Sequence, residues 1–417
     1  MNPSPVELVG AVLFAVAVIH TFMTKYFERL AHLQPAHAGM WHLLGEVEVV
    51  FGFWAFVLLG FLFFTGGAEA ATHYLEGLNY TEPAFVFVIM VIAASRPVLE
   101  LCRILAQGTA RYLPLNDSMA FYFVCLSLLP LLGSFVTEPA AMTLAALLLR
   151  DSFYAKGISI RLRYTTLGVL FVNVSIGGTL TPFAAPPVLM VAGKWGWDIW
   201  FMFATFGWKA MVAVFVNAGI ATLLYGVELK KLGRIKAEKP TVPVSLMLLH
   251  VGFLGGVVFF AHHPVMFMGI FLFFLGVAEA YKHYQDRLIL REGLLVAFFL
   301  AGLVTLGAQQ KWWLQDVLSG MSATTLYFGA TALTAITDNA ALTYLGSLVE
   351  GVSDTFKYSL VAGAVTGGGL TVIANAPNPA GFAILRGHFD DGAINPLGLL
   401  VTALPPTIVA ILAFQLL

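Results

Sequence analysis

Long apolar stretches separated by short polar loops run along almost the whole chain of 417 residues. A helix that crosses a bilayer needs about 20 predominantly apolar residues, and segments 200–226 and 395–417 are long enough to do so. The pattern predicts about ten crossings, at 6–22, 43–64, 84–101, 164–193, 200–226, 244–261, 264–281, 293–307, 357–386 and 395–417. We therefore expect an all-α polytopic membrane protein.

Two further apolar segments, 119–150 and 320–350, carry polar residues near their middle. The 228–239 loop collects Lys and Arg and is predicted to lie in the cytoplasm, where such residues accumulate. Counting crossings from this loop puts residues 309–316 on the outer side. It also makes 119–150 begin and end on the cytoplasmic side, and 320–350 on the outer side. Because neither arm of 119–150 is expected to span the membrane, both segments are interpreted as re-entrant hairpins.

Each half of the chain, 1–240 and 241–417, thus holds five crossings and one hairpin, in opposite orientations. This is the organisation of an inverted repeat, which is typical of secondary transporters. The repeat is also visible in the letters, because residues 137–143 read T-E-P-A-A-M-T and residues 337–343 read T-D-N-A-A-L-T. The halves are therefore predicted to be two oppositely oriented transmembrane repeats.

A second shared motif follows each hairpin. Residues 177–187 read G-G-T-L-T-P-F-A-A-P-P, and residues 367–377 read G-G-G-L-T-V-I-A-N-A-P. Gly and Pro inside an apolar segment predict a broken helix, so 164–193 and 357–386 are expected to break at the membrane middle. Non-helical backbone at that depth is tolerated only where it is buried in protein or lines a cavity.

Glu138 and Asp338 place a carboxylate at each predicted hairpin tip. A carboxylate at this depth is costly unless it is paired or serves an ion pathway. Burial favours its protonated form and a bound cation favours its charged form, so one site can hold either a proton or a sodium ion. Carbonyl groups at the broken ends would add partial negative charge. The predicted neutral oxygen ligands for sodium are Thr137, Thr179, Thr181, Thr337, Asn339, Thr371, Asn375 and Asn378.

Structural explanations exist for the same residues. Asp, Thr and Asn at a hairpin tip can simply cap the helix that follows. Small residues such as those of the Gly-Gly motifs can serve close helix packing instead of an ion site.

The composition agrees with a membrane protein, because 59% of the residues are hydrophobic and 11% are charged, against about 45–50% and 25% in soluble domains. The near-zero net charge says little about partners, and no nucleic-acid contact is expected. No phosphate-binding Gly-x-x-x-x-Gly-Lys-Ser/Thr motif is present, so transport driven by ATP in this chain is not expected. Cys102 and Cys125 imply neither a disulfide framework nor a metal site. No cofactor beyond the transported ions is predicted.

Other polar residues offer further hypotheses. Lys209 lies inside segment 200–226, where it would pair or compete with an ion, or extend to an interface as a lysine does when only its stem is buried. A second group consists of His32, His37, His42, Glu46 and Glu48. On one helix, His42 and Glu46 would share a face, as in a metal site, a proton relay or an interfacial cluster.

The motifs resemble those of the ion-transporter superfamily, which includes sodium/proton antiporters, arsenite efflux pumps and sodium/dicarboxylate symporters. Residues 337–343 are similar to its D-N-x-x-T hairpin signature, and residues 175–182 to its N-x-G-G-x-x-T-P segment. The branch of sodium/proton antiporters fits best. The resemblance implies ion-site roles for Asp338, Asn339 and Thr181, and a homodimer. The chain departs from the pattern at Glu138-Pro139, where Asp-Asn is usual, and at Ala184-Ala185, where Gly-Asp is common.

The sequence thus predicts a multi-pass transporter, not an enzyme, in the cytoplasmic (inner) membrane of a prokaryote. It would exchange sodium or lithium for protons by alternating access. One alternative is an arsenite-type oxyanion permease, with Lys209 facing the substrate. Another is an intramembrane metalloenzyme built on His32, His37, His42 and Glu46.

Overall fold

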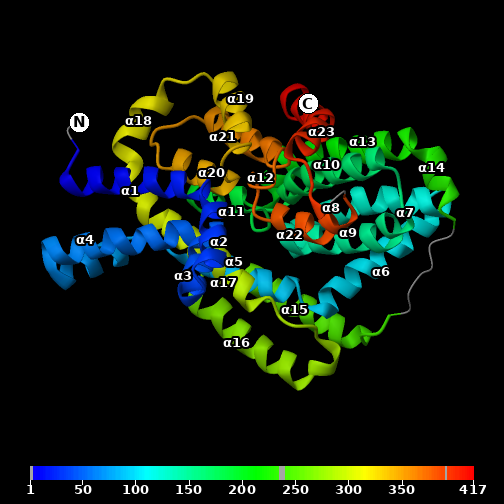
Figure 1. Cartoon of the computed structure of the whole chain (residues 1–417), viewed down its shortest axis with the longest axis horizontal. Coiled ribbons are helices and arrows are strands. Elements are labelled where there is room, and N and C mark those ends of the chain that lie inside the picture. The colour runs from blue at the N-terminus through cyan, green and yellow to red at the C-terminus, as the bar shows by residue number, and fades with distance from the viewer. Residues whose placement is uncertain (1–2, 234–239, 390–391) are drawn as a thin grey trace. The chain divides into compact units, whose positions relative to one another are not determined.

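The computed structural model describes residues 3–233, 240–389 and 392–417. Within these ranges the secondary structure consists of α-helices and short 3₁₀ or π turns, without a β-strand (Figure 1). Five helical runs are long and apolar enough to cross a membrane, or up to seven if each of two bent helix pairs is one span. The predicted class, an all-α polytopic membrane protein, is confirmed, and the figure of ten crossings stays a prediction. Three basic residues of the predicted cytoplasmic loop, Arg234, Lys236 and Lys239, lie outside the described residues.

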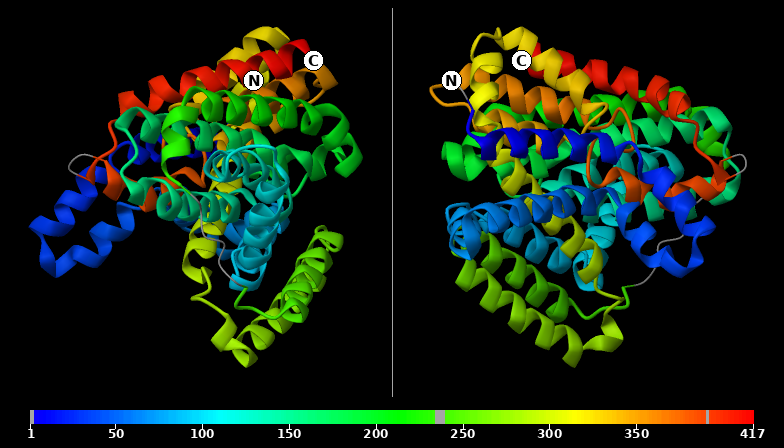
Figure 2. Two further views of the ribbon diagram at one scale, coloured as in Figure 1. Left: turned by 90° about the vertical axis from the view of Figure 1, so that its right-hand side faces the viewer. Right: turned by 60° about the vertical axis from the view of Figure 1, so that its left-hand side comes forward.

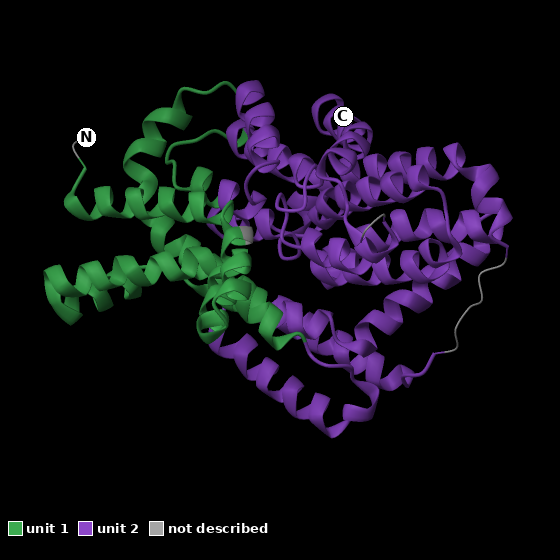
Figure 3. Ribbon diagram, viewed as in Figure 1, with its two compact units in different colours: residues 1–87, 289–322, 344–354 green, residues 88–288, 323–343, 355–417 purple. Residues whose placement is uncertain are grey.

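The chain divides into two compact units, each assembled from separate stretches of sequence (Figure 3). Unit 1 comprises residues 1–87, 289–322 and 344–354, and unit 2 comprises 88–288, 323–343 and 355–417. The predicted boundary between the repeats, at residues 240 and 241, stays a prediction.

Unit 1 is organised around two packed helices, α4 (Val47–Glu76) and α17 (Leu290–Gly307), with α1 (Pro5–Thr21) against both. The start of α1 is capped reciprocally, because Ser4 Oγ accepts from Glu7 N at 3.2 Å and the Glu7 carboxylate accepts from Ser4 N at 2.7 Å. The other elements are α2 (Thr24–Leu33), η1 (Pro35–His37), α3 (Ala38–Leu44), the first part of α5 (Thr81–Ala93), η6 (Ala308–Gln310), α18 (Lys311–Ser319) and the end of α20 (Asn339–Ser347).

We expect Gly302→Ala to lower the unfolding temperature of the protein in detergent. A Cβ atom at Gly302 of α17 would overlap the α4 backbone, lying 2.6 Å from the Gly52 Cα. Overpacking of this kind costs about 1–3 kcal/mol. The control Gly60→Ala, on α4, adds a Cβ with no atom within 4 Å. It should leave the unfolding temperature unchanged or slightly higher, since Ala is the better helix former. Equal temperatures for both variants would contradict this close approach of α4 and α17.

Unit 2 holds the first hairpin, residues 323–343 of the second hairpin and both broken helices. Its fully buried aromatic side chains include Tyr122, Phe153 and Phe171. In Figure 2 the helices α15 and α16 run beside each other as a helical hairpin. The elements are α6 (Arg96–Tyr112), α7 (Asp117–Leu126), α8 (Leu128–Val136), α9 (Glu138–Ser152), η2 (Tyr154–Lys156), α10 (Ile160–Gly177), η3 (Gly178–Leu180), α11 (Pro186–Trp195), α12 (Ile199–Met202), the π-helix η4 (Phe203–Gly207), α13 (Trp208–Leu224), α14 (Gly226–Lys231), α15 (Val244–Phe259), α16 (Pro264–Ala280), η5 (Lys282–Tyr284), α19 (Ala323–Thr334), α21 (Asp354–Gly367), α22 (Asn378–Leu385), η7 (Arg386–His388) and α23 (Pro396–Leu416).

Both predicted broken helices are present. The first runs through α10 and η3 and resumes as α11, whose first turn begins with Pro186 and Pro187. The second runs through α21 and resumes as α22 at Asn378. Proline suits the first turn of a helix, because the missing N–H has no partner there in any case. The breaks fall at 181–185 and 368–377, inside the predicted segments.

Each broken helix meets its own hairpin through a glycine. A Cβ on Gly177 would lie 2.8 Å from the Pro130 carbonyl oxygen of α8. A Cβ on Gly367 would likewise overlap the Thr331 carbonyl oxygen of α19. Only glycine allows such an approach to a backbone, so the repeated Gly-Gly motif does serve close packing, as the structural explanation proposed.

A second matched contact joins the first arm of each hairpin to its own broken helix. The Tyr122 hydroxyl of α7 bonds to the Thr166 hydroxyl of α10 at 2.7 Å, and the Tyr327 hydroxyl of α19 bonds to the Thr366 hydroxyl of α21 at 3.0 Å. Both threonines also donate to the carbonyl four residues earlier in their own helix. The repeated letters therefore correspond to repeated tertiary contacts inside unit 2.

Three predicted boundaries are corrected. The crossing predicted at 293–307 does not end there, because α17, η6 and α18 form one helical run of 30 residues, Leu290–Ser319. The Gln310 amide fits within it by donating to the Leu306 and Gly10 carbonyls at 2.9 and 3.2 Å. The first arm of hairpin 119–150 is 20 residues long, Asp117–Val136, and is therefore long enough to span. Segment 84–101 is bent by 64° between α5 and α6, where Arg96-Pro97 begins the second helix.

Candidate functional site

The tip of the first hairpin lies between α8 and α9, which pack against each other. Thr137 has φ 72° and ψ 150°, and it is the only non-glycine residue with positive φ in the described part of the chain. This backbone turns the chain sharply, so that α9 begins at Glu138. The Glu138 side chain is fully buried, with 0% exposure. The positive end of the α9 dipole is a favourable place for its charge.

The two oxygens of the Glu138 carboxylate have different surroundings. Oε2 accepts a hydrogen bond of 2.8 Å from Asn375 Nδ2, which lies in the break of the second broken helix. Oε1 has no hydrogen-bond partner among the described residues. It faces Gly178 at the end of the first broken helix, where a Cβ would overlap the carboxylate. One hairpin tip thus contacts both broken helices.

The second hairpin tip reaches the same region. Asn339 N donates to the Ala374 carbonyl at 3.1 Å, next to Asn375. The two tips are linked through neighbouring residues of the second break, because Asn375 bonds to Glu138 and Ala374 accepts from Asn339. Asp338 is partly buried, and its Oδ1 accepts from the backbone N–H groups of Ala340 and Ala341 at 2.8 and 3.1 Å. Asp338 therefore also caps α20, as the structural explanation proposed, whereas Glu138 bonds across to another element.

Several buried polar atoms in this region lack a hydrogen-bond partner in the described part of the chain. Their residues are at most 2% exposed, and the atoms are Thr137 Oγ1, Glu138 Oε1, both polar atoms of the Asn339 amide, Asn375 Oδ1 and Asn378 Oδ1. A buried polar atom without a partner carries a desolvation cost of about 1–3 kcal/mol. Most of these atoms are oxygens, the donor type that a hard cation requires.

The predicted threonine ligands also have structural bonds. Thr181 Oγ1 donates to the Ser134 carbonyl at 2.5 Å, and Thr371 Oγ1 donates to the Ala335 carbonyl at 2.8 Å, so each ties a break to its own hairpin. Thr179 Oγ1 donates to the Ile176 carbonyl at 2.7 Å. The partly buried Thr337 donates to the Asp338 carbonyl at 3.3 Å.

The carbonyl ends of the broken helices are more fully bonded than the sequence suggested. Ser134 Oγ donates to the Gly177 carbonyl at 2.7 Å and accepts from Leu180 N at 2.9 Å. Asn378 Nδ2 donates to the Gly368 carbonyl at 2.7 Å and to the Thr371 carbonyl at 2.8 Å. These carbonyls still have a second lone pair, but side chains already hold them in place.

Sequence reasoning missed two serines that shape the site. Ser134 holds the end of the first broken helix, and Ser175 Oγ donates across to the Val365 carbonyl of the second at 2.7 Å. The signal for Ser134 was present, because Ser134 and Thr334 are 200 positions apart, like Glu138 and Asp338. Ser175 stands beside Gly368, where a Cβ would overlap its hydroxyl.

The other candidates have their own partners. Lys209 Nζ donates to the Tyr358 hydroxyl at 3.0 Å and lies 4.6 Å from the centre of that ring. His42 is exposed, and Glu46 pairs with Arg291. His42 and Glu46 do not share a helix, because α3 ends at Leu44 and α4 begins at Val47.

The metal-site hypothesis for His32, His37, His42 and Glu46 is not supported. His32 and His42 stack edge to face with ring centres 6.2 Å apart. Across the described ranges, no group of three or more His, Cys, Asp or Glu side chains is arranged to hold a metal ion.

A family model described as "Putative Na+/H+ antiporter" matches residues 5–417. No curated protein matches the sequence.

Proposed function

The chain belongs to this antiporter family, and we propose that it exchanges sodium or lithium ions for protons across the cytoplasmic membrane of a prokaryote. The observation that carries the proposal is the buried Glu138 carboxylate, with one oxygen bonded to Asn375 and the other without a partner in the described ranges. An ionised carboxylate in such a place requires a compensating positive charge.

Two occupants supply that charge. A proton neutralises Glu138 directly and lets its carboxyl group donate a hydrogen bond. A sodium ion instead takes oxygen ligands, and Thr137, Asn375 and Asn378 each offer one within this region. Asp338 adds a second negative charge that strengthens either choice. Because each occupant favours the state of Glu138 that the other excludes, their binding is competitive.

Competition becomes exchange if the site opens to one side of the membrane at a time. The hairpins meet the broken helices at Gly177 and Gly367. We propose that small movements of the hairpins against the broken helices open the site to each side in turn. This is the alternating-access scheme expected of inverted repeats. The family resemblance adds the expectation of a homodimer.

An oxyanion permease is less well supported. The carboxylates of Glu138 and Asp338 at the two hairpin tips would repel an anion, and the Lys209 ammonium bonds to Tyr358. No described contact directs Lys209 toward Glu138 or Asp338.

The proposal is tested with purified protein in vesicles that contain a pH-sensitive dye and carry an imposed pH gradient. Adding sodium or lithium chloride should dissipate the gradient in protein-containing vesicles, whereas choline chloride should not. Protein-free vesicles control for leakage. A gradient that neither sodium nor lithium changes, in vesicles shown to contain folded protein, would reject sodium/proton exchange.

A further inference from the structure

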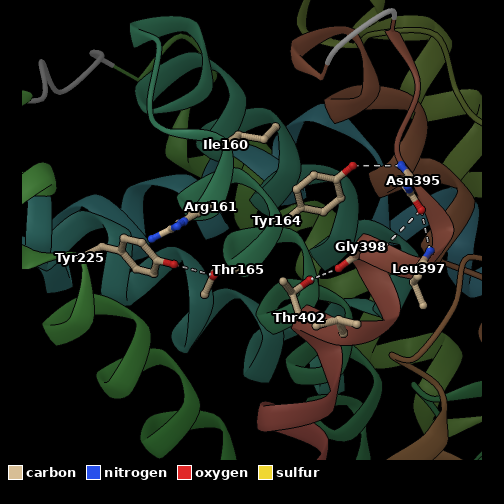
Figure 4. A pocket seen from close by; sticks show the side chains of 10 residues that line it. Ile160, Arg161, Tyr164, Thr165, Tyr225, Asn395, Leu397, Gly398 and Thr402 are labelled. Atoms are coloured by element: carbon tan, nitrogen blue, oxygen red, sulfur yellow. Dashed lines mark hydrogen bonds between the residues drawn. The ribbon is translucent and has the colours of Figure 1, made fainter.

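A cavity of about 500 Å³ lies in unit 2, where the ends of α10, α13 and α23 meet (Figure 4). This volume falls in the range of about 300–1,000 Å³ that is typical of small-molecule sites. Its lining includes Arg161, Tyr164 and Tyr225 on one side and Leu397 and Val401 on the other. None of the residues assigned to the ion site lines it.

The polar side of the cavity carries a cation and two phenol groups. Arg161 is exposed and has no ion pair or hydrogen bond through its guanidinium in the described part of the chain. The Tyr164 hydroxyl accepts from Asn395 N at 3.0 Å, which leaves its own proton available to donate. The Tyr225 hydroxyl pairs with Thr165 at 3.0 Å. The Glu228 carboxylate does not line the cavity. Its oxygens accept from Ser159 N and Oγ.

The α23 wall of the cavity is apolar and exposed. Leu397 and Val401 are 65% and 55% exposed although both are large and apolar. They begin a stripe of exposed apolar side chains on α23 that continues through Leu404 and Ile408. At the neighbouring end of α13, Leu223 and Leu224 are likewise exposed, beside Tyr225. In a membrane protein, lipid tails cover such surfaces.

We propose that this cavity binds one anionic phospholipid. The headgroup phosphate would contact Arg161 and the tyrosine hydroxyls, and an acyl chain would follow Leu397, Val401 and the α23 stripe. Arg suits phosphate because its planar guanidinium offers paired donors. The continuous apolar wall favours a lipid over a free phosphate ion, which would leave that wall in water. The inference does not depend on the proposed ion exchange.

The test measures lipid binding to the purified full-length protein by native mass spectrometry, with increasing phosphatidylglycerol in the detergent. We expect saturable binding that is weaker for phosphatidylcholine with the same chains. Arg161→Gln should weaken phosphatidylglycerol binding about fivefold, as expected for one basic residue at an anionic membrane surface. Arg161→Lys should retain part of the affinity. The matched control Arg111→Gln removes another exposed arginine of unit 2, and it should bind phosphatidylglycerol as tightly as the wild type does.

Each contrary result has a clear meaning. Equal binding of the two lipids, or unchanged binding by Arg161→Gln, would overturn the proposal. Displacement of phosphatidylglycerol by inorganic phosphate would show a free-anion site instead and would also overturn it. Lipid binding is also measured on Asp338→Asn. This variant should bind phosphatidylglycerol as the wild type does, because no residue assigned to the ion site lines the cavity.

Discussion

Glu138→Gln is expected to abolish sodium-dependent proton exchange in proteoliposomes. Glutamine has the same shape as glutamate and keeps an oxygen that can accept from Asn375 Nδ2, so the contact between the hairpin and the second break is preserved. The substitution removes the only charge of a fully buried side chain. Losing one partner of a buried charge interaction costs about 2–5 kcal/mol, so exchange should fall by about thirtyfold or more.

The control for this variant is Glu69→Gln, which removes an exposed carboxylate of α4 in unit 1 and should exchange ions as the wild type does. Unfolding temperatures of both variants are measured in detergent to show that they are folded. Wild-type exchange by Glu138→Gln would remove Glu138 from the ion site and with it the main support for the proposal.

Asp338→Asn is expected to reduce exchange strongly while leaving the fold intact. Asparagine caps helices as well as aspartate does, so its Oδ1 can still accept from Ala340 N and Ala341 N. The loss should be about tenfold to a hundredfold. It should be smaller than at Glu138, because Asp338 is only partly buried and its charge is partly screened. The initial rate is measured against sodium concentration, and the apparent affinity for sodium should fall.

Comparison with Asp338→Ala separates charge from capping. Alanine removes both, and loss of a cap costs about 1 kcal/mol. We therefore expect Asp338→Ala to unfold at a lower temperature than Asp338→Asn, with exchange equally poor in both. If Asp338→Asn exchanged sodium normally and only Asp338→Ala were impaired, Asp338 would be a structural cap.

The sequence was sufficient to locate the tips and the breaks. Acidic residues, Gly-Gly pairs and prolines inside apolar segments are rare enough that their repetition marked Glu138, Asp338 and both broken helices. The details of bonding were not accessible in the same way. Whether a threonine hydroxyl or a helix-end carbonyl is already bonded depends on tertiary neighbours such as Ser134, whose single polar atom carries no pattern of its own.

Boundaries were harder to predict where polar residues are accommodated inside a helix. Gln310 and its neighbours resemble a loop in sequence, yet the amide bonds to carbonyls of its own helix and of α1. His42 and Glu46 show the opposite case. Their spacing suits one helix, but Gly45 ends α3 between them.

The backbone of Thr137 distinguishes the first hairpin tip from the second. A β-branched residue at positive φ costs about 1–3 kcal/mol, and no other non-glycine residue in the described ranges, Thr337 included, adopts such a conformation. The motif at 137–143 therefore begins with a strained backbone, whereas the motif at 337–343 does not, although the two sequences have the same form. A chain with the Thr337 backbone at both tips would lack the sharp bend at Thr137 after which α9 begins with the buried Glu138.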